Sequence, residues 1–125
     1  MLFSQKQKAY ASKINAKRRE IESLESQLSV SQSRAVVAQQ RFDIDFDIHG
    51  WLFDQLKQGR NGQLGTFKGK SYRISESELN AHSTMVGGSA ATLSWHEENA
   101  SEFESLIKRR KAELEKLLAE RENIS

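Results

Sequence analysis

The stretch that decides the fold is Phe3–Phe42, with the sequence FSQKQKAYASKINAKRREIESLESQLSVSQSRAVVAQQRF. If Gln7 is an a position of a heptad, the a and d positions are Phe3, Gln7, Tyr10, Ile14, Lys17, Ile21, Leu24, Leu28, Ser31, Ala35, Ala38 and Phe42. Only Gln7, Lys17 and Ser31 interrupt this apolar stripe, and most of the residues between its members are polar. The pattern predicts a long amphipathic helix that packs against another helix in coiled-coil fashion.

A second stripe lies near the other end of the chain. Its a and d positions are Phe103, Ile107, Arg110, Leu114, Leu117, Arg121 and Ile124. Ser94 and Glu97 have the spacing of a capping box, so this helix is predicted over residues 94–124. Because isolated helices are marginal in water, the two stripes are expected to bury each other in an antiparallel hairpin.

The end of the first helix is ambiguous in the sequence. Residues 42–48 read FDIDFDI, a strict alternation that fits a strand. Asp is disfavoured in strands, however, and the aromatic residues of this region also fit one face of a helix. We therefore predict a helix over residues 1–58, either continuous or broken near residues 43–50.

Residues 59–93 form a Gly-containing connection. Within it, the alternation of apolar and polar residues over 64–74 predicts a β-hairpin. A capping-box spacing at its end predicts a short helix over 76–82. The pair Gly87-Gly88 predicts a flexible loop over 84–89. The expected fold is mainly α: an antiparallel helical hairpin or coiled coil with a small tip that contains the β-hairpin.

The composition suits long helices with much surface. The chain has 125 residues, which predicts a single domain (1–125), with 37% hydrophobic and 29% charged residues. It contains no Pro to break a helix and no Cys for disulfides or thiolate metal sites. The N-terminal segment has no apolar core of a signal peptide, and no apolar run could span a bilayer. We expect a soluble, cytoplasmic protein with no membrane partner.

No motif in the sequence predicts catalysis. GxSxG, P-loop and HExxH patterns are absent, so we expect no enzyme activity, no catalytic residue, no cofactor, no metal and no small-molecule substrate. The nearest approach to a metal motif is an acidic set, Asp43, Asp45, Asp47 and Asp54. These residues match calcium-loop spacing, but Ile48 stands where that loop requires Gly, which favours a solvated acidic face.

Aromatic and aliphatic residues suggest a protein partner. Trp51, Phe53 and Leu56 form a dense apolar patch beside Asp-rich sequence, and Trp95 lies near the predicted start of the second helix. Such residues are typical of interface centres. The competing interpretation is that the two Trp side chains close one end of the hairpin. We predict a non-enzymatic protein–protein interaction module that self-associates as a homodimer.

The alternative function is accessory nucleic-acid binding. Two basic clusters suggest it, Lys13, Lys17, Arg18 and Arg19 in the first helix and Lys68, Lys70 and Arg73 in the predicted β-hairpin. The second cluster is interleaved with Phe67 and Tyr72, which could stack on bases while the cations contact phosphates. The net charge of only +2 is lower than a dedicated nucleic-acid binder carries.

Overall fold

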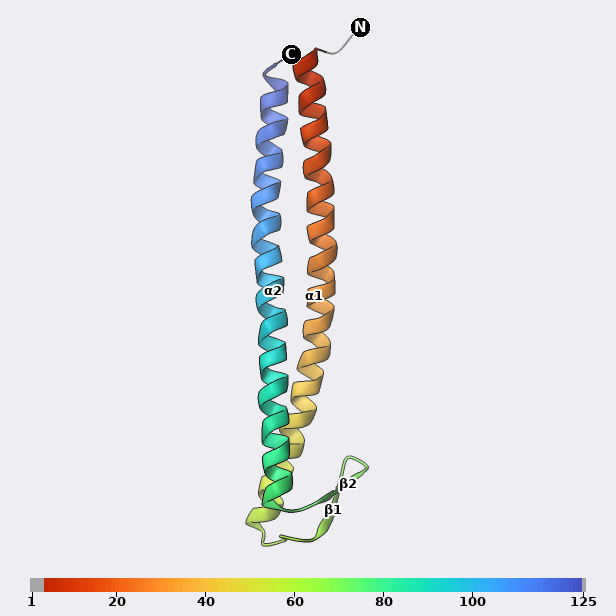
Figure 1. Cartoon of the computed structure of the whole chain (residues 1–125), viewed down its shortest axis with the longest axis vertical. Helices are drawn as coiled ribbons and strands as arrows, with labels where there is room; N and C mark the ends of the chain where they lie inside the picture. The colour runs from red at the N-terminus through yellow and green to blue at the C-terminus, as the bar shows by residue number, and fades with distance from the viewer. Residues whose placement is uncertain (1–3, 125) are drawn as a thin grey trace. The chain divides into compact units, whose positions relative to one another are not determined.

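The structure, a computed structural model, describes residues 4–124. Its elements, in order, are α1 (Gln5–Lys57), β1 (Leu64–Phe67), β2 (Lys70–Arg73) and α2 (Glu76–Glu122). Figure 1 shows the two helices side by side and antiparallel, with the strands in the connection between them. The predicted fold, a mainly α helical hairpin with a small β-hairpin, is therefore confirmed.

Helix α1 begins at a capping box that the sequence analysis did not identify. The Ser4 Oγ accepts a hydrogen bond from the Gln7 backbone N–H at 3.1 Å, and the Ser4 N–H donates to the Gln7 Oε1 at 3.2 Å. The helix then continues without interruption through residues 43–50, so no break occurs there and the alternating residues 42–48 are helical.

Helix α1 ends at Lys57, and Gly59, two residues later, has a φ of +76°. The Gly59 N–H donates to the Leu56 carbonyl at 3.0 Å, and the Arg60 N–H donates to the Gln55 carbonyl at 3.2 Å. This pair of bonds is a Schellman motif, in which a glycine in the left-handed conformation satisfies the last free carbonyls of a helix. The chain can therefore turn sharply and enter the β-hairpin.

The β-hairpin forms where it was predicted. Strands β1 and β2 pair antiparallel, with Leu64 opposite Arg73 and Phe67 opposite Lys70. The two-residue turn consists of Lys68 and Gly69, with φ values of +50° and +81°. Two positive φ angles are typical of a type I′ turn, whose twist matches that of the flanking strands.

Helix α2 differs from the prediction. The Ser75 Oγ accepts a hydrogen bond from the Glu78 N–H at 3.1 Å, so a helix does begin there. It then continues to Glu122. The predicted flexible loop over 84–89 and the separate helix start at 94 are therefore wrong. Each glycine costs about 1 kcal/mol relative to Ala inside a helix, which packing of the neighbouring turns can offset.

Burial follows the predicted heptad register. From Gln7 to Phe42, every a and d residue is buried or half-buried, and every residue between them is exposed. In the C-terminal part of α2 the buried and half-buried positions include Phe103, Ile107, Arg110, Leu114 and Leu117, and Ile124, two residues beyond the helix, is half-buried as well. Arg121 is exposed, contrary to its predicted place in the stripe, and Phe3 lies outside the described residues. The two stripes therefore identify the packed faces of the helices.

The packing divides into two compact units. Unit 1 comprises Met1–Gln32 and Glu98–Ser125, and unit 2 comprises Ser33–Glu97. The buried apolar side chains of unit 1 include Ile14, Ile21 and Ile107, and those of unit 2 include Ala38, Ile48, Leu52 and Ile74. The β-hairpin belongs to unit 2. Within residues 4–124, neither helix contains an apolar stretch long enough to cross a bilayer.

Candidate interaction surface

Trp51 packs against the β-hairpin. Its ring stacks on Phe67, with centroids 5.3 Å apart and planes at 18°, and it lies 5.8 Å from the ring of Tyr72. Tyr72 in turn meets the buried His82 edge-on at 5.6 Å. Trp51, a predicted interface residue, therefore belongs to the packing that holds the β-hairpin on α1.

Trp95 lies elsewhere in unit 2. The Ser89 hydroxyl donates a hydrogen bond to the Asp45 carboxylate, which fixes the pairing of the two antiparallel helices. Trp51 is six residues beyond Asp45, and Trp95 is six residues beyond Ser89 in the opposite direction. At 1.5 Å per residue the two Trp positions are about 18 Å apart along the helices. The interpretation that both Trp side chains close one end of the hairpin is therefore wrong.

The other predicted interface residues differ in exposure. Phe53 is 47% exposed and Trp95 is 56% exposed, whereas Leu56 is half-buried. The Lys57 ammonium lies 5.0 Å from the centre of the Phe53 ring. Phe53 and Trp95 are thus available to a partner, and the structure does not bring them together with Trp51 into one patch.

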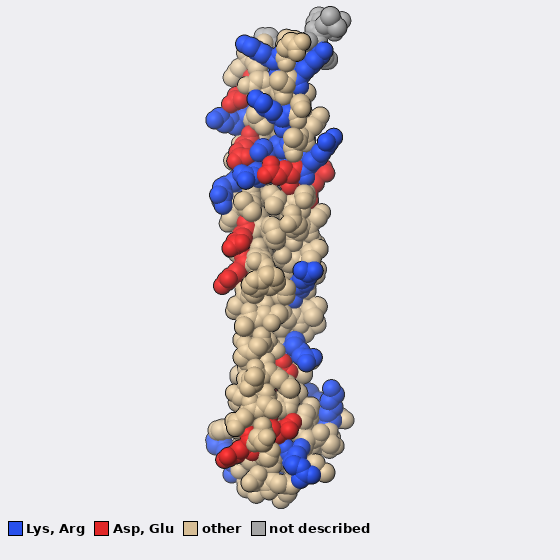
Figure 2. Space-filling model, viewed as in Figure 1, with Lys and Arg blue, Asp and Glu red and all other residues tan. Residues whose placement is uncertain are grey.

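A groove between α1 and α2 in unit 2 was not predicted. One part of it, about 340 Å³, is lined by Ala38, Arg41, Asp45, Met85, Gly88, Ser89 and Thr92. An overlapping part, about 560 Å³, is lined by Ser33, Arg34, Val37, Ala38, Arg41, Thr92 and His96. We call these lining residues the groove. On the face drawn in Figure 2, few charged side chains lie over the helical part of unit 2, whereas Lys, Arg, Asp and Glu are interspersed over unit 1.

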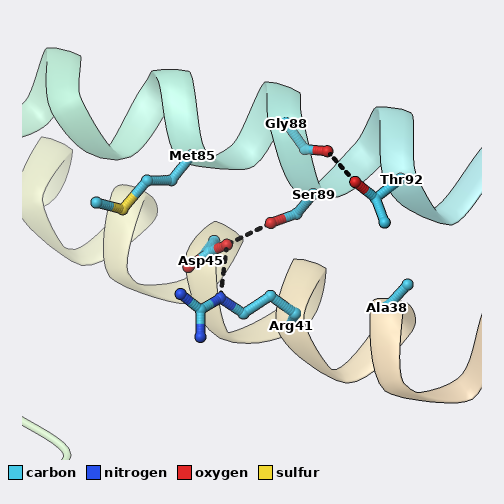
Figure 3. A pocket seen from close by; sticks show the side chains of 7 residues that line it. All are labelled: Ala38, Arg41, Asp45, Met85, Gly88, Ser89 and Thr92. Atoms are coloured by element: carbon cyan, nitrogen blue, oxygen red, sulfur yellow. Dashed lines mark hydrogen bonds and ion pairs between the residues drawn. The ribbon is translucent and has the colours of Figure 1, made fainter. Parts of the chain in front are cut away.

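The groove contains a buried carboxylate. Asp45 is only 4% exposed, because it occupies a d position of α1, although its side chain is a carboxylate. Its carboxylate accepts the hydrogen bond from Ser89 and lies 3.6 Å from the Nε of Arg41, as Figure 3 shows. Because a buried charge is costly unless it is paired and hydrogen-bonded, these partners explain how Asp45 is tolerated between the helices.

Several predicted nucleic-acid residues of unit 1 already have partners. Lys17 pairs with Glu113 at 2.8 Å and with Glu20 at 3.3 Å. Arg110 contacts the same two carboxylates, at 2.6 Å for Glu20 and 2.9 Å for Glu113. Lys13 lies 5.4 Å from the Tyr10 ring. The remaining members of this basic cluster, Arg18 and Arg19, are exposed.

The four charged groups of this network shift one another's pKa values. The hydrogen bond from Arg110 lowers the pKa of Glu20, and the hydrogen bond from Lys17 lowers the pKa of Glu113. The same bonds raise the pKa of both cations. A lowered carboxyl pKa stabilises the folded state above the unfolded value of about 4.3, and this contribution is lost as pH falls through the folded value.

We therefore expect that, in the double variant Glu20→Gln with Glu113→Gln, the free energy of unfolding depends less on pH in the acidic range. Wild-type stability should decrease between about pH 5 and pH 3 more steeply than that of the variant. Urea unfolding followed by circular dichroism across this range measures the difference. High salt should reduce it, because the four groups are solvent-accessible. Parallel profiles would show that the network does not form in solution.

Two of the three cations predicted to contact phosphates from the β-hairpin already have hydrogen-bond partners within the chain. Lys68 pairs with Asp47 at 2.9 Å, and Arg73 donates to the Gly62 carbonyl at 3.2 Å. Lys70 is exposed. The aromatic side chains expected to stack on bases, Phe67 and Tyr72, are half-buried and face Trp51. The Lys68 ammonium lies 5.4 Å from the centre of the half-buried Phe67 ring, so this ring is packed between Lys68 and Trp51 contacts and is not free to stack on a base.

Within residues 4–124, no three His, Asp or Glu side chains converge as metal ligands do. The acidic residues with calcium-loop spacing lie on a continuous helix, where Asp45 points between the helices and Asp47 meets Lys68. The Nε2 of the buried His82 lies 3.2 Å from Glu78, and its Nδ1 has no hydrogen-bond partner.

No protein-family model matches this chain, and no similar curated protein or solved structure was found.

Proposed function

We propose that the protein is a non-enzymatic protein–protein interaction module that acts through its helical hairpin and self-associates. An adaptor, a chaperone, an assembly factor or a small inhibitor would each fit this class. The observation that supports it is the apolar surface of unit 2, where Val37 is 64% exposed and Trp95 is 56% exposed beside the groove. Exposed apolar surface next to a concavity is typical of interaction sites.

Self-association has to use a surface other than the heptad stripes. These stripes are buried within the chain, because α1 and α2 pack against each other. The exposed apolar residues of α1 in unit 2 lie off that seam, at Val36, Val37, Ile44, Phe46 and Phe53. A partner, including another copy, would gain hydrophobic free energy by covering them.

The test is the mass of the protein in solution. We expect light scattering after size exclusion, or sedimentation, to give a mass above the 14.2 kDa of one chain, increasing with protein concentration. The homodimer is the smallest expected form. A single species of 14.2 kDa throughout the micromolar range would contradict the proposed self-association.

Nucleic-acid binding is the weaker alternative. We expect no mobility shift with duplex or single-stranded DNA or with RNA, even at about 50 mM salt, where phosphate contacts are strongest. The reason is that Lys17 and Lys68 are paired with carboxylates and the hairpin aromatics are packed. A shift that weakens steeply with salt, and disappears in the triple variant K68E, K70E and R73E, would favour the alternative.

A further inference from the structure

We propose that the groove of one copy binds the opposite side of α1 from a second copy, in a head-to-tail contact. This inference rests on the proposed self-association and names the two surfaces that meet. The second surface, which we call the acidic face, consists of Phe46, Phe53, Asp47 and Asp54. Both surfaces lie in unit 2, within residues 33–97.

The groove can accept a helix. Its lining includes the small residues Ala38, Gly88 and Ser89, which allow another backbone to approach closely. Val37 and Met85, both exposed, supply apolar contacts at its sides. From Ser33 to Asp45 the groove follows twelve residues of α1, about 18 Å or slightly more than three helical turns.

The groove also carries a net positive charge. Arg34 and Arg41 line it seven residues apart, about 10 Å along the helix. Among the lining residues the only carboxylate is Asp45, which accepts a hydrogen bond from Ser89 and lies 3.6 Å from the Nε of Arg41. Arg34 is therefore the groove cation to which a second helix could bring a carboxylate, together with apolar residues.

The acidic face has these properties. Phe46 and Phe53 are 57% and 47% exposed and are seven residues apart. Asp47 and Asp54, each next in sequence to one of these Phe residues, are also exposed and seven residues apart. Asp47 forms an ion pair with Lys68, while no ion pair involves Asp54 within residues 4–124. The two surfaces therefore match in apolar content, and the carboxylate of Asp54 is opposite in charge to the Arg34 guanidinium of the groove.

The contact is head-to-tail because the two surfaces point in opposite directions. Phe46 follows Val37 by nine residues, and at 100° per residue this places the two side chains on opposite sides of α1. One neighbour therefore cannot fill the groove and cover the acidic face of the same copy through a single interface. Heterologous contacts of this kind form rings or open assemblies, so the mass should grow beyond a dimer at high concentration.

Single-surface variants test the pairing by sedimentation. Val37→Glu places a carboxylate in the groove and should weaken self-association at least about tenfold. Val30→Glu is the matched control, because Val30 has the same heptad position and is also exposed but does not line the groove. Phe46→Gln with Phe53→Gln should weaken association as much as Val37→Glu, and circular dichroism should show that all variants keep their helices.

The mixing experiment separates this inference from simple self-association. Copies with Val37→Glu keep the acidic face, and copies with Phe46→Gln and Phe53→Gln keep the groove. Each variant alone should be monomeric, whereas an equimolar mixture should form a 1:1 complex and nothing larger. If wild type self-associates but these variants do too, the head-to-tail contact is wrong and the proposed function stands. A wild-type monomer contradicts both.

Charge reversal gives an independent check. Arg34→Glu should weaken association by about fivefold or more, and the effect should decrease at high salt. Arg18→Glu makes the same change of charge on an exposed residue of unit 1 and should leave association within about twofold of wild type. Equal effects of the two variants would indicate that only net charge matters and would overturn the assigned surfaces.

Discussion

Replacing Leu52 with Ala is expected to lower the free energy of unfolding by about 2–5 kcal/mol. Leu52 is 0% exposed and occupies a d position of α1. The fully buried Ile74, which follows β2, and the buried Ile48 also belong to the core of unit 2. Because the residues of a close-packed core relax only partly, most of the space that the missing methyl groups leave stays empty.

The adjacent residue provides the control. Phe53 is 47% exposed, so Phe53→Ala should change stability by about 1 kcal/mol or less, although it removes the larger side chain. Urea unfolding followed by helical circular dichroism measures both. Fluorescence of Trp51 in a Trp95→Phe background reports on the same unit. Equal losses in the two variants would mean that the heptad register does not extend into this part of α1.

The register itself could be predicted, because it depends on local periodicity. Side chains at a and d positions fall on one side of a helix whatever partner covers them. Gln7, Lys17 and Ser31 kept their places in the stripe despite their polarity, since the apolar residues around them fix the helix orientation. The β-hairpin was also predictable from its alternation and from the turn at Lys68 and Gly69.

The continuity of α2 could not be predicted from local signals. The d positions of its N-terminal half are His82, Ser89 and His96, so the apolar stripe that marks the C-terminal half is interrupted there. Next to Gly87, this polar pattern resembles a loop. In the structure Ser89 meets Asp45 of α1, His96 lines the groove between the helices, and the buried His82 contacts the Tyr72 ring. Tertiary packing thus overrides low helix propensity, and the interacting residue is 44 positions away.

The groove was missed for a related reason. A groove depends on which residues of α2 lie opposite α1, and that pairing is set by the connection and by the contact between Asp45 and Ser89. One signal was nevertheless present in the sequence. Val37 and Ile44 repeat at seven residues on a position outside the seam, which predicts a second apolar contact. Both side chains are exposed in the structure, so they are not covered by α2 and remain accessible to a partner.

Gly65 should not tolerate even the smallest side chain. A Cβ atom there would lie 2.9 Å from two ring atoms of Trp51, Cη2 and Cζ2, and 3.1 Å from the Cδ1 of Ile74. The Trp51 ring cannot withdraw easily, because it is stacked on Phe67 and lies 5.8 Å from the Tyr72 ring. Gly65→Ala is therefore expected to lower the free energy of unfolding by about 1–3 kcal/mol through overpacking.

The same substitution at Gly87 should have the opposite sign. Gly87 lies inside α2 and a Cβ there would meet nothing within 4 Å, so Ala should add about 0.5–1 kcal/mol of stability through its higher helix propensity. Denaturant unfolding of both variants, with Trp51 fluorescence in the Trp95→Phe background, gives the comparison. A stabilising Gly65→Ala would mean that β1 does not pack against Trp51. A destabilising Gly87→Ala would mean that residues 84–89 form the loop predicted from the sequence and not a part of α2.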